Sequence, residues 1–154
     1  MLSPEEIREI EEEAAKLPQR ASASIEALKI VQRRRGWITD EAIRDIAERL
    51  GMSAEELDGV ATFYNLIYRR PVGRHVILVC DSVSCWIMGS NKIFRELRER
   101  LGIEPGGTTA DGRFTVVPNA CLGICERAPA LMVGEDLHTD LEPGTLDRIL
   151  ERYR

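Results

Sequence analysis

The sequence predicts an N-terminal helical bundle over residues 1–70, followed by a small α/β (α+β) domain over residues 71–154. Two observations support this division. Apolar residues recur at helical spacing in the first part, whereas the run His75–Val79 is continuous, as in a strand buried on both faces. Between them, RRPVGR at residues 69–74 contains a proline and a glycine that interrupt the helical pattern. We therefore place the joint between the two parts here.

Four helices are expected in the first segment. The first and the fourth begin at capping boxes, SPEE at residues 3–6 and SAEE at residues 53–56, which satisfy backbone N–H groups of the first helical turn. The second helix closes with Arg33–Arg35 and Gly36, as a helix C-terminus favours. The third begins at Thr39, whose hydroxyl can cap it. Their apolar stripes predict a helical core.

The second segment reads as strand, helix, strand, hairpin and helix. The expected ranges are a strand at 75–79, a helix at 93–101, a strand at 114–117, a hairpin of 130–133 with the segment around Leu137, and a last helix that opens at Pro143. A right-handed crossover makes the first two strands parallel. The residues that follow these strands then meet at one end of the sheet, where open α/β sheets place their sites.

The charge pattern argues against a nucleic-acid partner. The chain of 154 residues has a formal net charge of −5, with acidic and basic side chains spread evenly along it. Residues 43–60 resemble a helix-turn-helix, but Glu55, Glu56 and Asp58 lie in the first turns of the helix that would meet DNA phosphates. We therefore expect no binding of nucleic acid.

The sequence favours a cytoplasmic protein without direct membrane insertion. The N-terminus has neither the basic start nor the apolar stretch of a signal peptide. The strongly apolar runs, such as Val76–Val79, are too short to cross a bilayer. In the cytoplasm thiols stay reduced, so paired cysteines are better explained by metal than by disulfides.

All four cysteines fall in two loops, Cys80-Asp81-Ser82-Val83-Ser84-Cys85 and Cys121-Leu122-Gly123-Ile124-Cys125. Each loop follows an expected strand, so the two loops can turn four sulfurs toward one inorganic centre. Gly123 allows the second loop to bend tightly, and backbone N–H groups of both loops could hydrogen-bond the sulfurs.

The cysteine spacing favours an iron–sulfur cluster. It differs from the closely packed cysteines of bacterial four-iron sites and from the plant ferredoxin pattern, whereas two separated pairs suit one pair for each iron of a two-iron cluster. Structural zinc held by four cysteines remains the alternative, because its ligand spacing overlaps with this one. Visible absorbance that is lost on reduction would separate the two.

The neighbours of the cysteines allow several roles. Trp86–Met88 follow a cysteine directly and could shield the centre, dock a partner or pack in the core. His75 and His138 are expected to be structural or surface residues, because four thiols are already available. We expect Ser82 and Ser84 to cap or turn the chain rather than to bind metal.

Three stretches carry a resemblance to a known family. VCDSVSC, then TADGRFTVVPNACLGICERAPALMVGEDLHTDL, and the joint ATFYNLIYRRPVGRH resemble the thioredoxin-like [2Fe–2S] subunit of respiratory NADH:quinone oxidoreductase, the NuoE family of complex I. The resemblance covers nearly the whole chain. It implies a thioredoxin-like ferredoxin domain over residues 71–154 and one [2Fe–2S] cluster bound by Cys80, Cys85, Cys121 and Cys125.

The resemblance also implies a function and a partner. The chain would exchange single electrons with the FMN of a flavoprotein subunit (NuoF-like) that binds NADH, in the peripheral arm of a membrane-bound complex at its cytoplasmic face. FMN and NADH would bind to the partner alone, since this sequence has no Gly-rich phosphate loop. The helical segment would help to seat the partner. Glu126 and Arg127 depart from the family pattern beside the last cysteine.

Two alternatives to this function stay open. The chain could be the equivalent subunit of an NAD-linked hydrogenase or formate dehydrogenase. It could also be a stand-alone redox-sensing, ferredoxin-like protein. Co-purification with a flavoprotein subunit would distinguish the stand-alone protein from the subunits.

Overall fold

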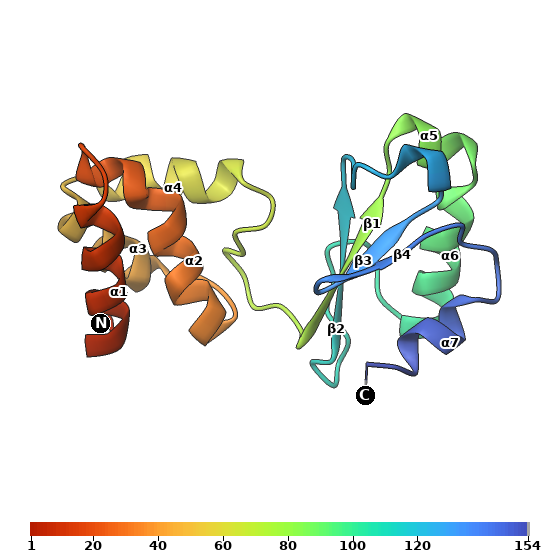
Figure 1. Ribbon diagram of the computed structural model, residues 1–154. Coiled ribbons are helices and arrows are strands. Elements are labelled where there is room, and N and C mark those ends of the chain that lie inside the picture. The colour runs from red at the N-terminus through yellow and green to blue at the C-terminus, as the bar shows by residue number, and fades with distance from the viewer. Residues whose placement is uncertain (154) are drawn as a thin grey trace. The chain divides into compact units, whose positions relative to one another are not determined.

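Helices build the N-terminal unit, Met1–Pro71, and a sheet with helices builds the unit that begins at Val72 (Figure 1). The computed structural model describes residues 1–153. The helices of the first unit are α1 (Pro4–Ala15), α2 (Ser24–Arg35), α3 (Asp40–Leu50) and α4 (Ala54–Phe63), with the 3₁₀ turn η1 (Arg20–Ala23) before α2. The four expected helices are therefore confirmed.

The capping residues fix the starts of these helices. The Ser3 hydroxyl accepts a hydrogen bond from the Glu6 N–H at 3.2 Å, and the Glu6 carboxylate accepts one from the Ser3 N–H at 2.7 Å. Ser53 and Glu56 repeat this capping box at the start of α4. Each box satisfies two backbone donors that the first helical turn leaves free.

The core of the helical unit is apolar and draws on every helix. Its fully buried members include Ile10 of α1, Leu28 of α2, Ile46 of α3 and Leu57 of α4. Burying such side chains supplies most of the stability of helices of this length, because isolated helices this short are marginal in water.

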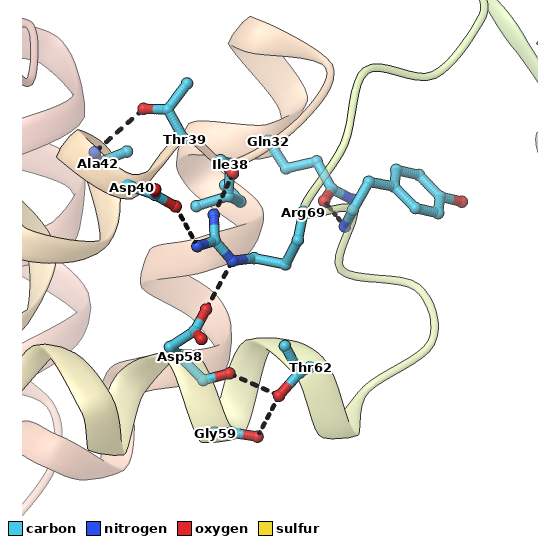
Figure 2. A network of polar contacts seen from close by, with 10 residues as sticks. Gln32, Ile38, Thr39, Asp40, Ala42, Asp58, Gly59, Thr62 and Arg69 are labelled. Atoms are coloured by element: carbon cyan, nitrogen blue, oxygen red, sulfur yellow. Dashed lines mark hydrogen bonds and ion pairs between the residues drawn. The ribbon is translucent and has the colours of Figure 1, made fainter.

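The chain that leaves α4 is tied back onto the helical unit. Arg69 donates to Asp58 at 2.7 Å, to Asp40 at 2.6 Å and to the Ile38 carbonyl (Figure 2). The Gln32 side chain also accepts from the Tyr68 N–H at 2.6 Å. These bonds attach the segment that ends at Arg69 to α2, α3 and α4. The joint between the two units is therefore confined to the few residues after Arg69.

The second unit is a mixed four-stranded sheet with the order β2-β1-β3-β4. Its strands are β1 (His75–Cys80), β2 (Phe114–Asn119), β3 (Leu131–Val133) and β4 (Asp136–His138). β1 and β2 are parallel, whereas β3 pairs antiparallel with β1 and with β4. The parallel first pair and the hairpin are as the sequence predicts.

Three helices complete this unit: α5 (Val83–Ile87), α6 (Ser90–Leu101) and α7 (Leu146–Leu150). In Figure 1, α6 and α7 lie together beside the sheet, and α5 lies at the end of the sheet where β1 finishes. Ile93 and Leu97 of α6 pack in one core with Ile77 of β1 and Phe114 of β2.

Two local predictions need correction. The last helix begins at Leu146 rather than at Pro143, because the Gly144 N–H donates to the Glu96 carboxylate at 3.0 Å and 3.1 Å and Pro143-Gly144 forms a turn. The short helix α5 inside the first cysteine loop was not expected at all.

Gly73 lies where the chain enters the sheet, and only glycine fits there. A Cβ atom at this position would lie 2.9 Å from backbone atoms of Arg113 and Phe114. The Gly73 N–H donates to the buried Thr115 hydroxyl at 2.7 Å. Among residues 1–153, no helix is both long and apolar enough to span a membrane.

Candidate metal centre

The first cysteine loop is rigid because regular structure holds both of its thiols. Cys80 is the last residue of β1, and its N–H donates to the Ala130 carbonyl at 3.1 Å. Cys85 lies in α5, whose turn is closed by a bond from the Trp86 N–H to the Ser82 carbonyl at 2.8 Å. Both cysteines are buried. Ser82 occupies the N-cap position of α5, but its side chain makes no capping hydrogen bond there.

The second cysteine loop is open to solvent. Cys121 and Cys125 are exposed, and their sulfurs lie 3.8 Å apart. The Gly123 N–H points at the Cys121 sulfur at 3.3 Å. Gly123 has a φ of 79°, in the left-handed region that favours glycine, and this bend turns the chain around the sulfur. The 3₁₀ turn η2 (Cys125–Arg127) begins at the last cysteine.

The parallel strands bring the two loops together. Cys80 is paired in register with Asn119, the last residue of β2, and the Asp81 N–H donates to the Asn119 carbonyl at 3.0 Å. The Ser84 side chain lowers the pKa of Cys125, so a residue of the first loop lies near a thiol of the second. The predicted meeting of both loops at one end of the sheet is therefore present.

Burial and neighbouring thiols raise the pKa of Cys85 and of Cys125. Burial raises the pKa of Cys85 to about 11, with further contributions from the hydrogen bond to Cys80 and from the neighbouring Cys125. The hydrogen bond with Cys121 and the charge of that thiol raise the pKa of Cys125, against a smaller lowering by Ser84. Metal ligands must be thiolates, so a bound cation would have to compensate this cost.

The donor set fits a cysteine-ligated metal centre. A tetrahedral ion with metal–sulfur bonds of about 2.3 Å, the length at zinc–cysteine sites, holds two sulfurs roughly 3.8 Å apart. The sulfurs of Cys121 and Cys125 already have this separation. All four cysteines are free thiols. Within residues 1–153, no group of three or more His, Cys, Asp or Glu side chains is placed to hold a single metal ion.

The outer face of α5 is apolar and exposed. Val83, Trp86, Ile87 and Met88 retain 65%, 58%, 69% and 61% of their accessible surface. The alternative that Trp86–Met88 pack in the core is therefore wrong. These side chains form an apolar surface directly beside Cys85, which we call the α5 surface.

Both histidines lie in a network with Tyr153 rather than at the cysteines. The His138 ring is hydrogen-bonded to the Tyr153 hydroxyl at 2.9 Å, and this hydroxyl donates to Asp136 at 2.7 Å. The His75 ring packs 5.5 Å from the Tyr153 ring, centroid to centroid. Arg127, whose role the sequence leaves open, pairs with Asp140 at 2.6 Å.

Two contacts at the centre were missed at the level of sequence. Asn119 donates from its side chain to the Cys121 carbonyl at 3.1 Å, and the Ala130 carbonyl accepts the Cys80 N–H at 3.1 Å. Asn119 is the last residue of the strand before the second loop, and this position in the sequence is the only feature that could have identified it as a contact of the centre. The contacts of Ala130 depend on β3 pairing with β1, which no local pattern reveals.

A parallel strand pair with two thiol pairs at its C-terminal edge is the arrangement of a small α/β protein with a cysteine-ligated metal centre. The family model described as thioredoxin-like [2Fe–2S] ferredoxin matches residues 10–154. The chain belongs to this family, and membership implies a [2Fe–2S] cluster.

The similar proteins specify the branch of the family. The NuoE subunit of the NADH-quinone oxidoreductase from Pseudomonas aeruginosa is 51% identical over 153 residues, covering 99% of this chain and 92% of that protein. The same subunit from Escherichia coli K12 gives the same identity and coverage. The chain is thus a member of the NuoE family of NADH-quinone oxidoreductase subunits, as the resemblance implied.

A solved structure extends the likeness to a second type of complex. A crystal structure of an NAD⁺-reducing [NiFe]-hydrogenase in the H₂-reduced state matches with a TM-score of 0.72 at 25% identity. The match covers 85% of this chain but only 22% of the hydrogenase chain.

Proposed function

We propose that Cys80, Cys85, Cys121 and Cys125 hold one [2Fe–2S] cluster and that the chain is the one-electron carrier of an NADH-quinone oxidoreductase. NADH and FMN would bind to a partner flavoprotein subunit, with which this chain exchanges single electrons. The observation that carries the proposal is the arrangement of four free thiols as two pairs from two loops that meet at the edge of the sheet.

Each thiol pair suits one iron. A [2Fe–2S] cluster supplies one-electron exchange, and four cysteine thiolates complete its ligand set. Cys121 and Cys125 form one pair by their sulfur separation, and Cys80 and Cys85 form the other because they lie in one buried cluster.

The surroundings of the thiols suit an electron-transfer centre that faces a partner. Cys80 and Cys85 are buried and exclude water from one side, while Cys121 and Cys125 are exposed on the other. The Gly123 N–H donates toward the Cys121 sulfur, and such bonds stabilise added negative charge on the sulfurs. The exposed thiols provide the short path that electron exchange with a flavin needs.

The α5 surface supports docking of the flavoprotein beside the centre. Four exposed apolar side chains next to Cys85 are costly in water unless a partner covers them. A stand-alone ferredoxin-like protein has no use for such a surface, so the subunit function is favoured. The equivalent subunit of an NAD-linked hydrogenase is second, because the solved hydrogenase is 25% identical whereas the NuoE relatives reach 51%.

Iron and acid-labile sulfide analysis of the purified chain tests the proposal. We expect two irons and two sulfides per chain and a visible spectrum that bleaches on reduction. Cys125→Ser should lose most of this absorbance, because a serine oxygen is a poor substitute for a thiolate at iron. A colourless protein that carries one zinc would contradict the proposal, and so would a Cys125→Ser variant with a full complement of iron.

A further inference from the structure

The two cysteine loops are held in place by different means. The first loop lies within regular structure, since Cys80 belongs to β1 and Cys85 to α5. The second loop leaves the sheet at Asn119 and reaches η2 only at Cys125, with both of its thiols exposed. The position of Cys121 therefore depends on individual contacts, which include the Gly123 N–H at its sulfur and the Asn119 side chain at its carbonyl.

Asn119 contacts both loops. Its carbonyl oxygen accepts the Asp81 N–H at 3.0 Å, directly after Cys80. Its side-chain amide donates to the carbonyl oxygen of Cys121 at 3.1 Å. Asn119 is half-buried and is paired in register with Cys80 across the parallel strands. One residue thus links the chain beside the first thiol to the chain beside the third.

We propose that Asn119 is a positioning residue for the cluster, whose side-chain amide fixes Cys121 at the correct distance from Cys80. This inference rests on the proposed function, because it assumes that both thiols bind the same cluster. Asn119 touches neither the iron nor the sulfide; it acts through the backbone of Cys121. Its side chain supplies a donor that alanine lacks, while its backbone bond to Asp81 survives substitution.

Substitution of the side chain on the full-length, cluster-loaded protein tests this role. Asn119→Ala removes the donor, Asn119→Gln keeps an amide on a longer chain, and Asn91→Ala is a matched control on the exposed start of α6. Three properties are measured: the rate of cluster loss to a chelator, the electron paramagnetic resonance spectrum of the reduced cluster, and the far-ultraviolet melting temperature.

The proposal has a specific expected outcome. Loss of one hydrogen bond near a ligand should speed cluster release about fivefold in Asn119→Ala. The resonance spectrum of this variant should shift because the geometry at one iron changes. The rate of cluster release from Asn119→Gln should lie between the rates of Asn119→Ala and the unsubstituted chain. Asn91→Ala should match the unsubstituted chain in all three properties.

Two results would overturn the proposal. One is an Asn119→Ala protein with unchanged release and an unchanged spectrum. The other is faster release with an unchanged spectrum and a lower melting temperature, which is the behaviour of a merely structural residue. If the unsubstituted chain holds no [2Fe–2S] cluster, the proposed function fails first, and this failure is visible before any variant is compared.

Discussion

Glu6 of α1 is almost fully buried, yet it carries a charge. Its carboxylate accepts the Ser3 N–H at 2.7 Å and the Arg35 side-chain Nε–H at 2.8 Å, and a second bond joins it to Arg35. A buried carboxylate is tolerated only when such bonds replace its lost hydration. The ion pair joins the start of α1 to the end of α2, so it contributes to the packing of these two helices.

Glu6→Gln should lower the free energy of unfolding of the helical unit by about 2 kcal/mol at pH 7, because one charge is removed from a buried, hydrogen-bonded pair. Glu9→Gln is the matched control. Glu9 also lies on α1 and pairs with Arg34 of α2, but it is partly exposed, so Glu9→Gln should cost about 0.5 kcal/mol. Urea unfolding followed by Trp37 fluorescence in a Trp86→Phe background measures both. Equal losses in the two variants would contradict the role of Glu6.

The pH dependence of the Glu6 effect follows from its pKa. Burial alone would raise the pKa of Glu6, but hydrogen bonds from Arg35 and Ser3, with the charges of Arg35 and Arg34, lower it below its usual 4.5. A lowered carboxyl pKa gives stability that is present above the unfolded-state pKa and is lost as pH falls through the folded-state value. The difference between Glu6→Gln and the unsubstituted chain should therefore shrink when unfolding is measured well below pH 4.5.

The sequence predicts only part of this residue-scale arrangement. The spacing of Ser3 and Glu6 predicts the capping box, and it is present. The partner of the same carboxylate, Arg35, lies 29 positions away. Sequence reasoning treats Arg33–Arg35 as a helix end because a local pattern contains no information about which helix packs beside it.

Among the elements, α5 is the one that sequence reasoning missed. It has five residues, Val83–Ile87, and most of their residue types have modest helix propensity. The helix exists because tertiary structure buries Cys85 beneath it. The strands and longer helices were predictable because their hydrophobic periods repeat over enough residues to be recognised. No such repeating pattern in the sequence predicts whether the side chains of Trp86, Ile87 and Met88 point into the core or toward solvent.

The α5 surface should determine affinity for the flavoprotein subunit. Trp86→Gln with Ile87→Gln should weaken association at least tenfold, because exposed aromatic side chains are frequent anchors of interfaces. The visible spectrum of the cluster should stay unchanged, since neither side chain binds metal. Leu137→Gln is the control, because Leu137 is also an exposed apolar residue of the second unit but lies on β4. Titration of the purified flavoprotein subunit against each variant measures the affinities.

Two outcomes would exclude this role for α5. Unchanged affinity of the double variant would remove the α5 surface from the interface. Equal weakening by Leu137→Gln would mean that general loss of apolar surface, and not the location beside Cys85, accounts for the effect.

At the scale of the whole molecule, each of the two units has its own main hydrophobic core within residues 1–153, and a small third cluster contains Cys80, Cys85 and Ala128. The core of the helical unit draws on residues up to Ile67, and the core beside the sheet begins at Ile77. The thiols, the paired strands and Asn119 all belong to the second unit. The proline and glycine of residues 69–74 predict a joint there, but Arg69 itself is bonded to the helical unit. The members of each core are not predictable in this way, because burial depends on contacts between distant segments.

A chain that begins at Val72 should therefore keep the cluster and lose partner affinity. Its sheet, α6 and α7 retain their own core, so it should melt cooperatively and show the visible and electron paramagnetic resonance spectra of the full chain. Association with the flavoprotein should weaken, because the helical unit is then unavailable to help seat the partner. If the shortened chain folds but loses its iron, the cluster site depends on the helical unit. If it binds the flavoprotein with full affinity, the helices have no role in assembly, and the α5 surface with its neighbourhood must carry the interface alone.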